Sequence, residues 1–337
     1  MTPALPLLSV LDQSPVADGS RPGDALRNSI DLARLADALG YHRYWLAEHH
    51  GSPALACNSP EVLIGPIAQA TRRIRVGSGG IMLPHYSPLK VAESFGMLAG
   101  LFPGRIDLGI GRAAGTDRST AFALQRDRLH VSPDDFTEQL DELLGYLAGE
   151  LPADHSFARL ARATKSDAQP WLLGSSPQSA IWAGERGLPY VFADFINRSG
   201  AENADLYRAQ FLPTADRPRP YVGVAVWAVV AETDEAAQDL TASSRMMLDL
   251  LHRGRLIAVP SVAAAKAFLA EQPDGRFAMA QSRRIVAGRP DTVRPALEAV
   301  AAEYGADEVL VVNILHDHAA RRRSYELLAE AWTLAAV

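Results

Sequence analysis

Three features of the sequence predict an α/β fold in which eight parallel strands alternate with helices and close into a (β/α)8 barrel. Short apolar runs alternate with amphipathic stretches along the whole chain, which is the pattern of a parallel sheet wrapped by helices. Eight such runs are present, as a closed TIM barrel requires. The length of 337 residues also suits one barrel with insertions. We therefore expect a single domain over residues 1–337.

The eight apolar runs locate the predicted strands. They are Leu7–Gln13, Tyr44–Ala47, Ile74–Ser78, Ile106–Gly111, Trp171–Gly174, Tyr190–Asp194, Tyr221–Val230 and Val309–Leu315. Apolar residues recurring every three or four positions predict helices between the strands. The clearest of these are Asp24–Leu39, Pro60–Thr71, Leu89–Leu101 and Pro177–Arg186.

Two connections are longer than a simple crossover needs. They run from about Arg112 to Pro170 and from about Glu232 to Asp307, so we predict insertions after strands four and seven. Helical patterns over Pro133–Ala148 and Asp234–Leu251 indicate that much of both insertions is ordered, and Gln272-Pro273-Asp274-Gly275 indicates a turn. Insertions at strand ends often carry function.

Composition excludes several classes of protein. No apolar run approaches the roughly 20 residues of a membrane span, and the N-terminus carries no export signal, so we expect a cytoplasmic protein without a membrane partner. A net charge of -6 offers no basic surface for nucleic acid. The single cysteine, Cys57, excludes an intramolecular disulfide and a cysteine-rich metal site. Redox chemistry would therefore need a cofactor.

Barrel enzymes place catalytic groups where strands end and the following loops begin. The predicted strand ends are rich in polar residues and glycine. They carry Asp12-Gln13-Ser14, Glu48-His49-His50, Ser78-Gly79-Gly80, Gly109-Ile110-Gly111-Arg112, Gly174-Ser175-Ser176 and Asn313 to His318. His49 and His50 ordinarily titrate near neutrality, as a proton donor or acceptor must, and Glu48 precedes them. We predict a catalytic group at Glu48-His49-His50, the alternative being loop histidines without a role.

A phosphate site is indicated at two neighbouring strand ends. Gly111-Arg112, followed by Gly115-Thr116-Asp117, offers a guanidinium for charge-assisted contacts with a phosphate. Gly174-Ser175-Ser176 and Ser179 lie at the start of a predicted helix, where free N–H groups favour an anion. Ordinary N-capping by Ser176 beside a surface arginine is the alternative.

Ser78-Gly79-Gly80 places two glycines where a strand favours bulky residues, which indicates either the close approach of a flat ligand or a plain bulge. His316-Asp317-His318 offers two imidazoles that a metal could use. Metal-dependent barrel hydrolases, however, generally carry such a pair on their first strand. We therefore predict no metal site.

Several of these segments, in order along the chain, resemble the bacterial-luciferase-like flavin-dependent monooxygenases. The resemblance is carried by Leu8–Pro15, Tyr44–His50, Arg75–His85, Pro103–Arg112, Gly174–Pro177, Gly187–Pro189, Leu315–His318 and Arg323–Leu328. The start Asp12-Gln13-Ser14-Pro15 and the His-x-His end are most similar to the mensacarcin-type branch, which includes tailoring oxygenases of aromatic polyketide clusters. Light-emitting members carry a cysteine where this chain has Gly111, so light emission is not expected.

The resemblance implies FMN as cofactor, in its reduced form FMNH2. It implies that His49 lies beside the isoalloxazine ring with Glu48 and His50 next to it. It also places a non-prolyl cis peptide at Gly79-Gly80 against that ring, and a phosphate contact at Arg112. Ser176 and Ser179 match further phosphate-binding positions.

The function predicted is transfer of one oxygen atom from O2 to a small organic substrate, an aromatic polyketide intermediate being one candidate. No glycine-rich dinucleotide fingerprint follows any strand, so a separate NAD(P)H:flavin reductase is the expected partner. Luciferase relatives pair through the helices after strands two and three, and the apolar residues in those helices predict a homodimer, the alternative being that they all pack on the sheet. These residues are Val62, Leu63, Ile64, Ile67, Val91, Phe95, Met97 and Leu98. Alternatives are a deazaflavin-dependent oxidoreductase and a non-enzymatic flavin-binding protein.

Overall fold

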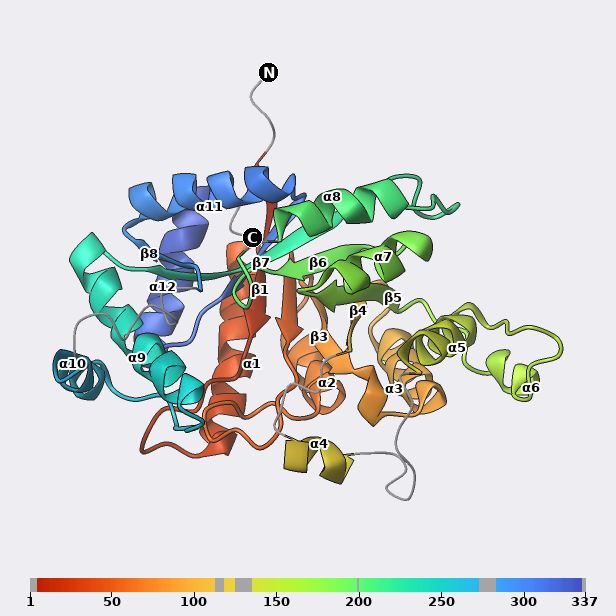
Figure 1. Cartoon of the computed structure of the whole chain (residues 1–337), viewed down its shortest axis with the longest axis horizontal. Helices are drawn as coiled ribbons and strands as arrows, with labels where there is room; N and C mark the ends of the chain where they lie inside the picture. The colour runs from red at the N-terminus through yellow and green to blue at the C-terminus, as the bar shows by residue number, and fades with distance from the viewer. Residues whose placement is uncertain (1–4, 113–117, 125–134, 199, 273–282, 335–337) are drawn as a thin grey trace.

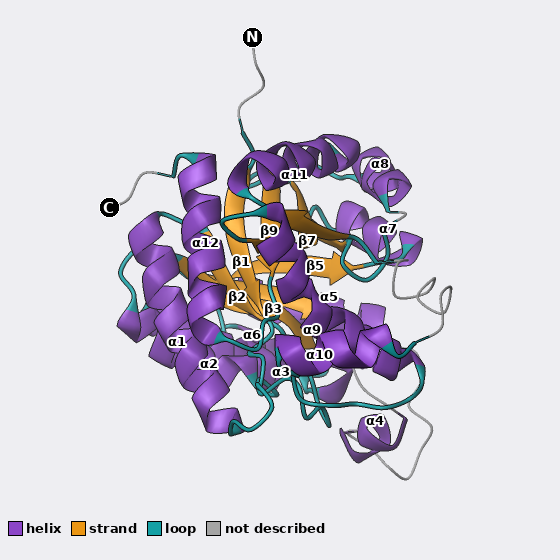
Figure 2. Cartoon of the chain, turned by 90° about the vertical axis from the view of Figure 1, so that its left-hand side faces the viewer, coloured by secondary structure: helices purple, strands orange, loops and turns teal. Residues whose placement is uncertain are grey.

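The computed structural model describes residues 5–112, 118–124, 135–198, 200–272 and 283–334. Strands occupy the centre of the molecule and helices surround them (Figure 1, Figure 2). α11 and α4 lie at opposite ends of the molecule in Figure 1.

The elements alternate between strand and helix as predicted. The strands are β1 Leu7–Asp12, β2 Arg43–Leu46, β3 Arg75–Met82, β4 Ile106–Gly111, β5 Gln169–Gly174, β6 Tyr190–Ala193, β7 Val222–Val230, β8 Ile285–Gly288 and β9 Glu308–Val312. The helices are α1 Pro22–Leu39, α2 Pro60–Ala70, the 3-10 turn η1 Leu83–His85, α3 Pro88–Leu101, α4 Arg118–Leu124, α5 Phe136–Ala148, α6 Ala158–Ala161, α7 Pro177–Glu185, α8 Ala201–Gln210, α9 Asp234–His252, α10 Val262–Ala270, α11 Pro290–Tyr304 and α12 His318–Trp332. None of the helices in the described part is long and apolar enough to cross a membrane.

Eight parallel strands close a (β/α)8 barrel, which confirms the predicted fold class. The ring runs from β1 through β6 to β7 and β9, and β9 pairs with β1 from Leu7 opposite Glu308 to Val10 opposite Val311. β7 is long enough to pair with three neighbouring strands. Its first half pairs with β6, its middle with β9, and its last four residues, from Trp227 onward, with β8.

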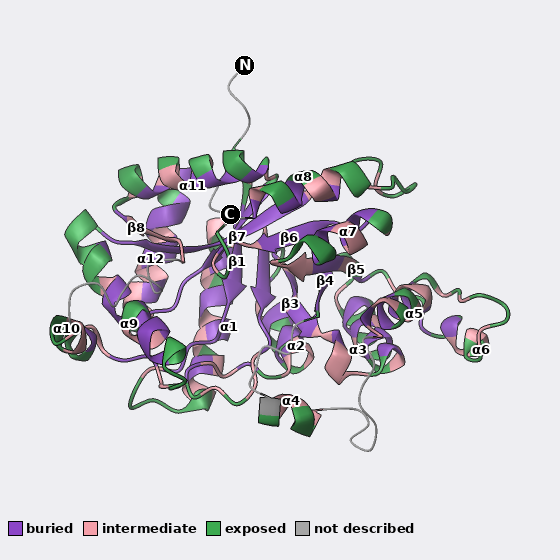
Figure 3. Ribbon diagram, in the orientation of Figure 1, coloured by how far each residue is buried: buried purple, intermediate pink, exposed green. Residues whose placement is uncertain are grey.

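Alternation along the strands separates two apolar cores. In β7, Val224 and Val226 pack among the residues that face the helices, whereas Ala225 and Trp227 belong to the cluster inside the barrel. Figure 3 shows most of the strand residues buried, whereas the outer faces of helices such as α11 are exposed. Members of the inner cluster include Leu11, Trp45, Ala47, Trp171, Val191, Val229, Leu310 and Val312.

Short local sequence signals begin and end the helices. Pro22 begins α1, where its missing N–H costs nothing, and Gly40 ends the helix with φ 84°, a left-handed conformation that glycine adopts without strain. Thr233 caps α9 by accepting a hydrogen bond from the Ala236 N–H at 3.1 Å. These signals fix where α1 and α9 begin or end.

The N-terminal end of the barrel interior holds a buried network of charges. Arg43 Nε donates to Glu308 Oε1 and its Nη1 donates to Asp107 Oδ2, both at 2.8 Å. Arg75 Nη2 donates to the other Asp107 oxygen at 2.6 Å, and the Tyr221 hydroxyl donates to Glu308 Oε2 at 2.7 Å. The Arg43 guanidinium also stacks 4.3 Å from the Trp171 ring centroid. Opposite charges therefore compensate one another at this end.

Most strand predictions agree with the structure to within a few residues, but two need correction. The sequence prediction had no strand between Val230 and Val309, whereas β8 occupies Ile285–Gly288. This strand is short and pairs at the end of the sheet, so its four residues lacked a pattern of their own. The predicted third strand ended at Ser78, whereas β3 continues to Met82 with a register shift between Ser78 and Ile81.

The two long connections are insertions, as predicted. Between β4 and β5 the described residues form α4, α5 and α6, and between β7 and β9 they form α9, α10, β8 and α11. The helix predicted over Asp234–Leu251 is α9, and the one over Pro133–Ala148 is α5, described from Phe136 onward. The predicted turn at Gln272-Pro273-Asp274-Gly275 lies almost wholly outside the described residues.

Candidate active site

A cavity of about 530 Å³, called the main cavity below, lies at the C-terminal ends of β1, β2, β6, β7 and β9, the end where barrel enzymes carry their chemistry. A volume of this size suits a small-molecule ligand. Its lining is mainly aromatic and aliphatic, with a few polar side chains among them. The lining residues include Gln13, His49, His50, Phe195, Trp227, Met247, Leu251, Arg255 and Arg283.

Glu48 is fully buried behind the cavity and holds its surroundings in place. One carboxylate oxygen lies 2.7 Å from His50 Nε2, and the other accepts the Met82 N–H at 3.0 Å. Burial, and then the charge of Glu48, raise the pKa of the Tyr86 phenol. Glu48 therefore ties the end of β2 to the end of β3. The structure supports a positioning role for this carboxylate, since His49 and His50, rather than Glu48, line the cavity.

The backbone of His49 is fixed by a hydrogen bond, whereas its ring has a buried nitrogen without a partner among the described residues. Its N–H donates to the Cys57 carbonyl at 2.9 Å, which pins the loop after β2. Its ring atom Nδ1 is buried and has no hydrogen-bond partner in the described part of the chain. Burial, with a smaller contribution from His50, lowers the pKa of His49 to about 4. The ring is therefore neutral at pH 7 and able to accept a proton.

Two more buried donors on residues lining the cavity have no partner within the described residues. They are Gln13 Nε2 and Trp227 Nε1, and each side chain is only 3% exposed. A buried donor left unpaired costs about 1–3 kcal/mol. With His49 Nδ1, three side chains of one cavity thus carry polar atoms without partners. A bound molecule with matching polar atoms would recover part of that cost.

The residues predicted to bind phosphate meet at the ends of β4 and β5. Ile110 pairs with Leu172, so the same register continued by two residues places Arg112 beside Gly174. The Arg112 guanidinium lies 5.3 Å from the ring centroid of Trp182 on α7. The structure therefore brings Arg112 to the helix that begins after Ser176. The neighbouring Gly115-Thr116-Asp117 lies outside the described residues.

Two of the predicted serines take part in the start of α7 itself. The exposed Ser176 caps the helix by accepting the Ser179 N–H at 3.4 Å. Ser179 is buried, donates to the Ser176 carbonyl at 2.8 Å and lies 3.1 Å from the Tyr190 hydroxyl. Gly174 packs so closely that a Cβ would overlap the Ser179 side chain. The capping alternative is thus present, and Ser175 and Ser176 remain the accessible serines beside Arg112.

Close contacts explain why β3 has glycine at positions 79 and 80. The Gly79-Gly80 peptide is cis, in agreement with the resemblance. A Cβ on Gly80 would lie 2.8 Å from the Gly109 carbonyl oxygen, and one on Gly79 would overlap the Leu11 side chain. Ser78 is fully buried, and its hydroxyl donates to the same Gly109 carbonyl at 2.8 Å. At the end of β4, a Cβ on Gly111 would meet Met82 Sδ at 3.2 Å.

The histidines after β9 lie away from His49. His318 Nε2 is 2.9 Å from Asp31 Oδ2 of α1, and His316 and His318 line a separate cavity of about 270 Å³. Burial lowers the pKa of His318, against the opposing effect of Asp31. Within the described residues no group of His, Cys, Asp and Glu side chains suits a metal ion.

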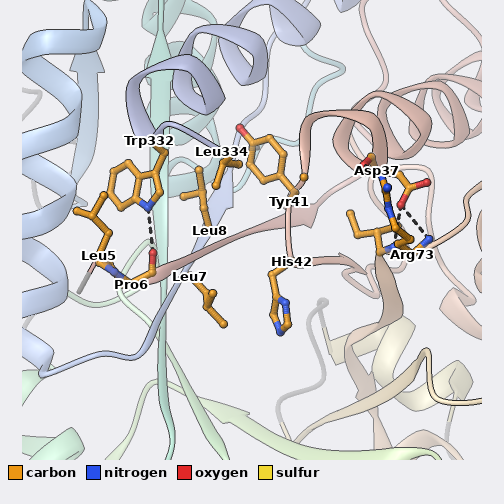
Figure 4. A pocket seen from close by; sticks show the side chains of 12 residues that line it. Leu5, Pro6, Leu7, Leu8, Asp37, Tyr41, His42, Arg73, Trp332 and Leu334 are labelled. Carbon is orange, nitrogen blue, oxygen red and sulfur yellow. Dashed lines mark hydrogen bonds between the residues drawn. The ribbon is translucent and has the colours of Figure 1, made fainter. Parts of the chain in front are cut away.

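A further cavity of about 450 Å³ lies at the other end of the barrel (Figure 4). It is bordered by the segment before β1, the end of α1 and the end of α12. Trp332 Nε1 donates to the Pro6 carbonyl at 2.9 Å, and the Asp37 carboxylate accepts the Arg73 N–H at 3.0 Å. The first contact joins the two end segments of the described chain, and the second joins the end of α1 to the segment before β3, so we assign this cavity a structural role.

Sequence reasoning missed several residues of the main cavity. Trp227 faces it because β7 alternates inward and outward, a pattern visible in the sequence as Val-Ala-Val-Trp-Ala-Val. Phe195, just after β6, could have been found in the same way. Arg255 and Arg283 come from the second insertion, between elements, where no periodicity indicates a position.

Comparison with known proteins agrees with the geometry. Residues 7–308 match the family described as luciferase-like monooxygenase. A luciferase-like monooxygenase of Escherichia coli K12 is 38% identical, with 97% of each chain covered. N-acetyl-S-alkylcysteine monooxygenase of Bacillus subtilis strain 168 is 36% identical, covering 96% of this chain and 97% of that protein. The crystal structure of apo-MsnO8, a mensacarcin-type enzyme, superposes with a TM-score of 0.90 at 42% identity, covering 98% of this chain and 99% of that one.

Proposed function

Because the chain belongs to the luciferase-like monooxygenase family, we propose that it is an oxidoreductase that uses FMNH2 and O2 to oxygenate a small organic substrate. The observation that carries the proposal is the cavity at the strand ends, where neutral His49 lies with the side-chain donors of Gln13 and Trp227, which have no partner in the described parts of the chain. A binding protein without catalysis would not need a desolvated imidazole at this position.

The described residues fit a flavin mononucleotide. Arg112 and the accessible start of α7 at Ser175 and Ser176 would hold the phosphate. Gly79 and Gly80 lack the Cβ atoms that would crowd β3, and this strand end lies between the phosphate residues and the histidines in the order of the ring. Reduced flavin supplies the activation of O2 and the oxygen atom that is transferred.

The protein would contribute proton control and exclusion of water. With a pKa of about 4, the His49 ring is neutral at pH 7, so accepting a proton is the role that this geometry favours. Glu48 would act through His50 and Met82, by holding the two strand ends together. The apolar lining would keep bulk water from the reacting atoms.

The lining also bears on the substrate. Phe195, Trp227 and Met247 offer an apolar and aromatic surface, which suits an organic molecule with a hydrophobic body. We propose an aromatic polyketide intermediate as one such substrate, in antibiotic biosynthesis, by analogy with the mensacarcin-type relative. Relatives in this family also include an enzyme named for N-acetyl-S-alkylcysteine, so the class of substrate needs a direct screen.

We propose that a separate NAD(P)H:flavin reductase supplies FMNH2. The support is the sequence, which has no glycine-rich dinucleotide fingerprint after any strand. Adding such a reductase with NADH and FMN should start turnover that NADH and FMN alone do not sustain. Turnover with NADH in the absence of any reductase would contradict this arrangement.

A homodimer is the proposed assembly. Of the apolar residues expected at the interface, Leu63, Ile64, Ile67, Val91, Phe95 and Leu98 are buried inside the subunit. Val62 is 70% exposed, and Met97 and Leu101, one helical turn apart, are each 69% exposed. These exposed side chains on α2 and α3 are the support for pairing. Sedimentation at micromolar concentration should give twice the subunit mass, and a Val62→Glu, Met97→Glu variant should sediment as a monomer.

The test of the proposed function compares cofactors. The purified protein should bind FMNH2 in preference to a reduced deazaflavin, and the FMNH2-loaded protein should consume O2 with oxygenation of a substrate from an organic panel. Binding of the deazaflavin with hydride transfer and no O2 uptake would establish the alternative oxidoreductase. Flavin binding without any turnover across the panel would favour a storage protein.

A further inference from the structure

The charge on the main cavity is one-sided. Among the described residues that line it, Arg255 and Arg283 carry full positive charges, and no aspartate or glutamate lines it with them. Arg255 is exposed, whereas Arg283 is partly buried. An apolar cavity with a cationic boundary is a site for a molecule that has a hydrophobic body and an anionic group.

Arg283 stands out when it is compared with the next residue in the chain. Arg284 donates to Glu303 at 2.8 Å and lies 3.4 Å from the Asp194 carboxylate. Arg283 has neither a hydrogen bond nor an ion pair with any part of the chain that the structure describes. Burial lowers the pKa of Arg283, and no neighbouring acid opposes the shift. Desolvating a guanidinium is costly unless a partner compensates the charge.

We propose that Arg283, assisted by Arg255, binds an anionic group of the organic substrate, a carboxylate in the simplest case, while the apolar body of the substrate occupies the cavity beside His49 and Trp227. This inference rests on the proposed function, because it assigns the cavity to the substrate. A planar guanidinium binds a carboxylate through two parallel hydrogen bonds, which fixes the orientation of the molecule as well as its position.

An oxyanion near Arg283 has two possible sources, the substrate and the phosphate of the flavin. The structure favours the substrate. In the proposed function, Arg112 and Ser176 hold the phosphate at the ends of β4 and β5. The cavity lies at the ends of β1, β2, β6, β7 and β9, and Arg283 comes just before β8, which pairs with β7. In the sheet order, β8 follows β7 and is not a neighbour of β4 or β5, so Arg283 enters the cavity from a different strand than the residues proposed for the phosphate.

The first arm of the test uses octanoate and octanamide, which have the same apolar body and differ in charge. Binding to the full-length protein would be measured by calorimetry, with tryptophan fluorescence as a second readout because Trp227 lines the cavity. We expect octanoate to bind about tenfold or more tightly than octanamide, as one charge-assisted contact allows. Arg283→Gln should remove this preference, Arg283→Lys should keep part of it, and Arg245→Gln, which changes an exposed arginine of α9, should leave it unchanged.

The second arm compares FMN with riboflavin, which lacks the phosphate. Arg283→Gln should leave the affinity for both unchanged. A selective loss of FMN affinity would show that Arg283 binds the flavin phosphate and would overturn the proposal. Equal binding of octanoate and octanamide by the unaltered protein, or a preference that survives in the Arg283→Gln, Arg255→Gln variant, would overturn it as well. Neither arm depends on turnover, so failure of the oxygenation assay would not decide the outcome.

Discussion

At the N-terminal end of the barrel, Arg43 donates to Glu308 and Asp107 at 2.8 Å each, whereas at the C-terminal end the Nδ1 of His49 has no partner among the described residues. Both sets of polar groups are buried. The first set is compensated by opposite charges within the chain, and the second set would find its partners on a bound ligand. In a barrel of this class the N-terminal end supports stability and the C-terminal end carries chemistry. The contrast in pairing follows that division.

The contrast has an energetic consequence. Removing one member of a compensated buried pair leaves the other charge desolvated, so variants at the N-terminal end should lose stability. Removing a group that has no partner in the chain leaves no other buried polar group unpaired. Variants at the C-terminal end should therefore lose binding or catalysis while the fold persists.

The largest effect is expected for Arg43→Met. It leaves Glu308 and Asp107 without the shared guanidinium, and the free energy of unfolding should fall by about 3–5 kcal/mol. Urea unfolding measures the change. Arg323→Gln, which breaks contacts of a partly exposed arginine with Glu232, should cost less than about 1 kcal/mol. A loss for Arg43→Met as small as that of the control would contradict the division between the two ends.

Arg112→Ala changes the C-terminal end of the barrel, where we expect a loss of binding rather than of stability. Binding of FMN should weaken by about 1.5–3 kcal/mol, the contribution of a charge-assisted phosphate contact, while the free energy of unfolding stays nearly constant. Isothermal titration gives the affinity, and riboflavin is the control because it has no phosphate to lose. An unchanged dissociation constant for FMN would remove Arg112 from the phosphate site.

A smaller effect is expected from the titration of His49. Its pKa is lowered to about 4, so between pH 6.5 and 4 the unfolded chain binds a proton that the folded protein does not. This residue therefore lowers stability as the pH falls through that window, by on the order of 2 kcal/mol at pH 5. Above pH 7 the contribution vanishes.

Thermal unfolding of His49→Gln at pH 7 and pH 5 checks this expectation. The variant should lose less stability on acidification than the unaltered protein. His252→Gln, which changes an exposed histidine at the end of α9, should retain the original dependence. Identical acid dependence in all three proteins would show that the His49 ring is not desolvated in solution.

Much of the fold could be predicted because the apolar runs are strong and regular. The pattern Val-Gly-Val-Ala-Val-Trp-Ala-Val-Val of β7 alternates large side chains toward the helices and the barrel interior, and the prediction missed its bounds by one residue. β8 was missed because Ile285–Gly288 is short and owes its conformation to pairing with Trp227–Val230 rather than to its own sequence.

For the site, sequence reasoning could find residues that follow strands, but not those that reach it from the insertions. His49, His50 and Gln13 lie at predicted strand ends, and the barrel topology brings them to one cavity. Arg283 comes from a segment without periodicity, so only the three-dimensional structure shows that it lines the cavity. The sequence also offered His318 as a possible ligand, whereas long-range packing pairs it with Asp31.

The most direct test of the account is His49→Ala in single turnover. The variant, loaded with FMNH2 and mixed with aerated buffer and a substrate found by the oxygen-uptake screen, should form product about 10² to 10⁴ times more slowly. Its affinity for FMN and its melting temperature at pH 7 should match those of the unaltered protein, because the phosphate residues lie at the ends of β4 and β5. Product formation at the original rate in a well-folded, FMN-binding variant would contradict the assignment of His49.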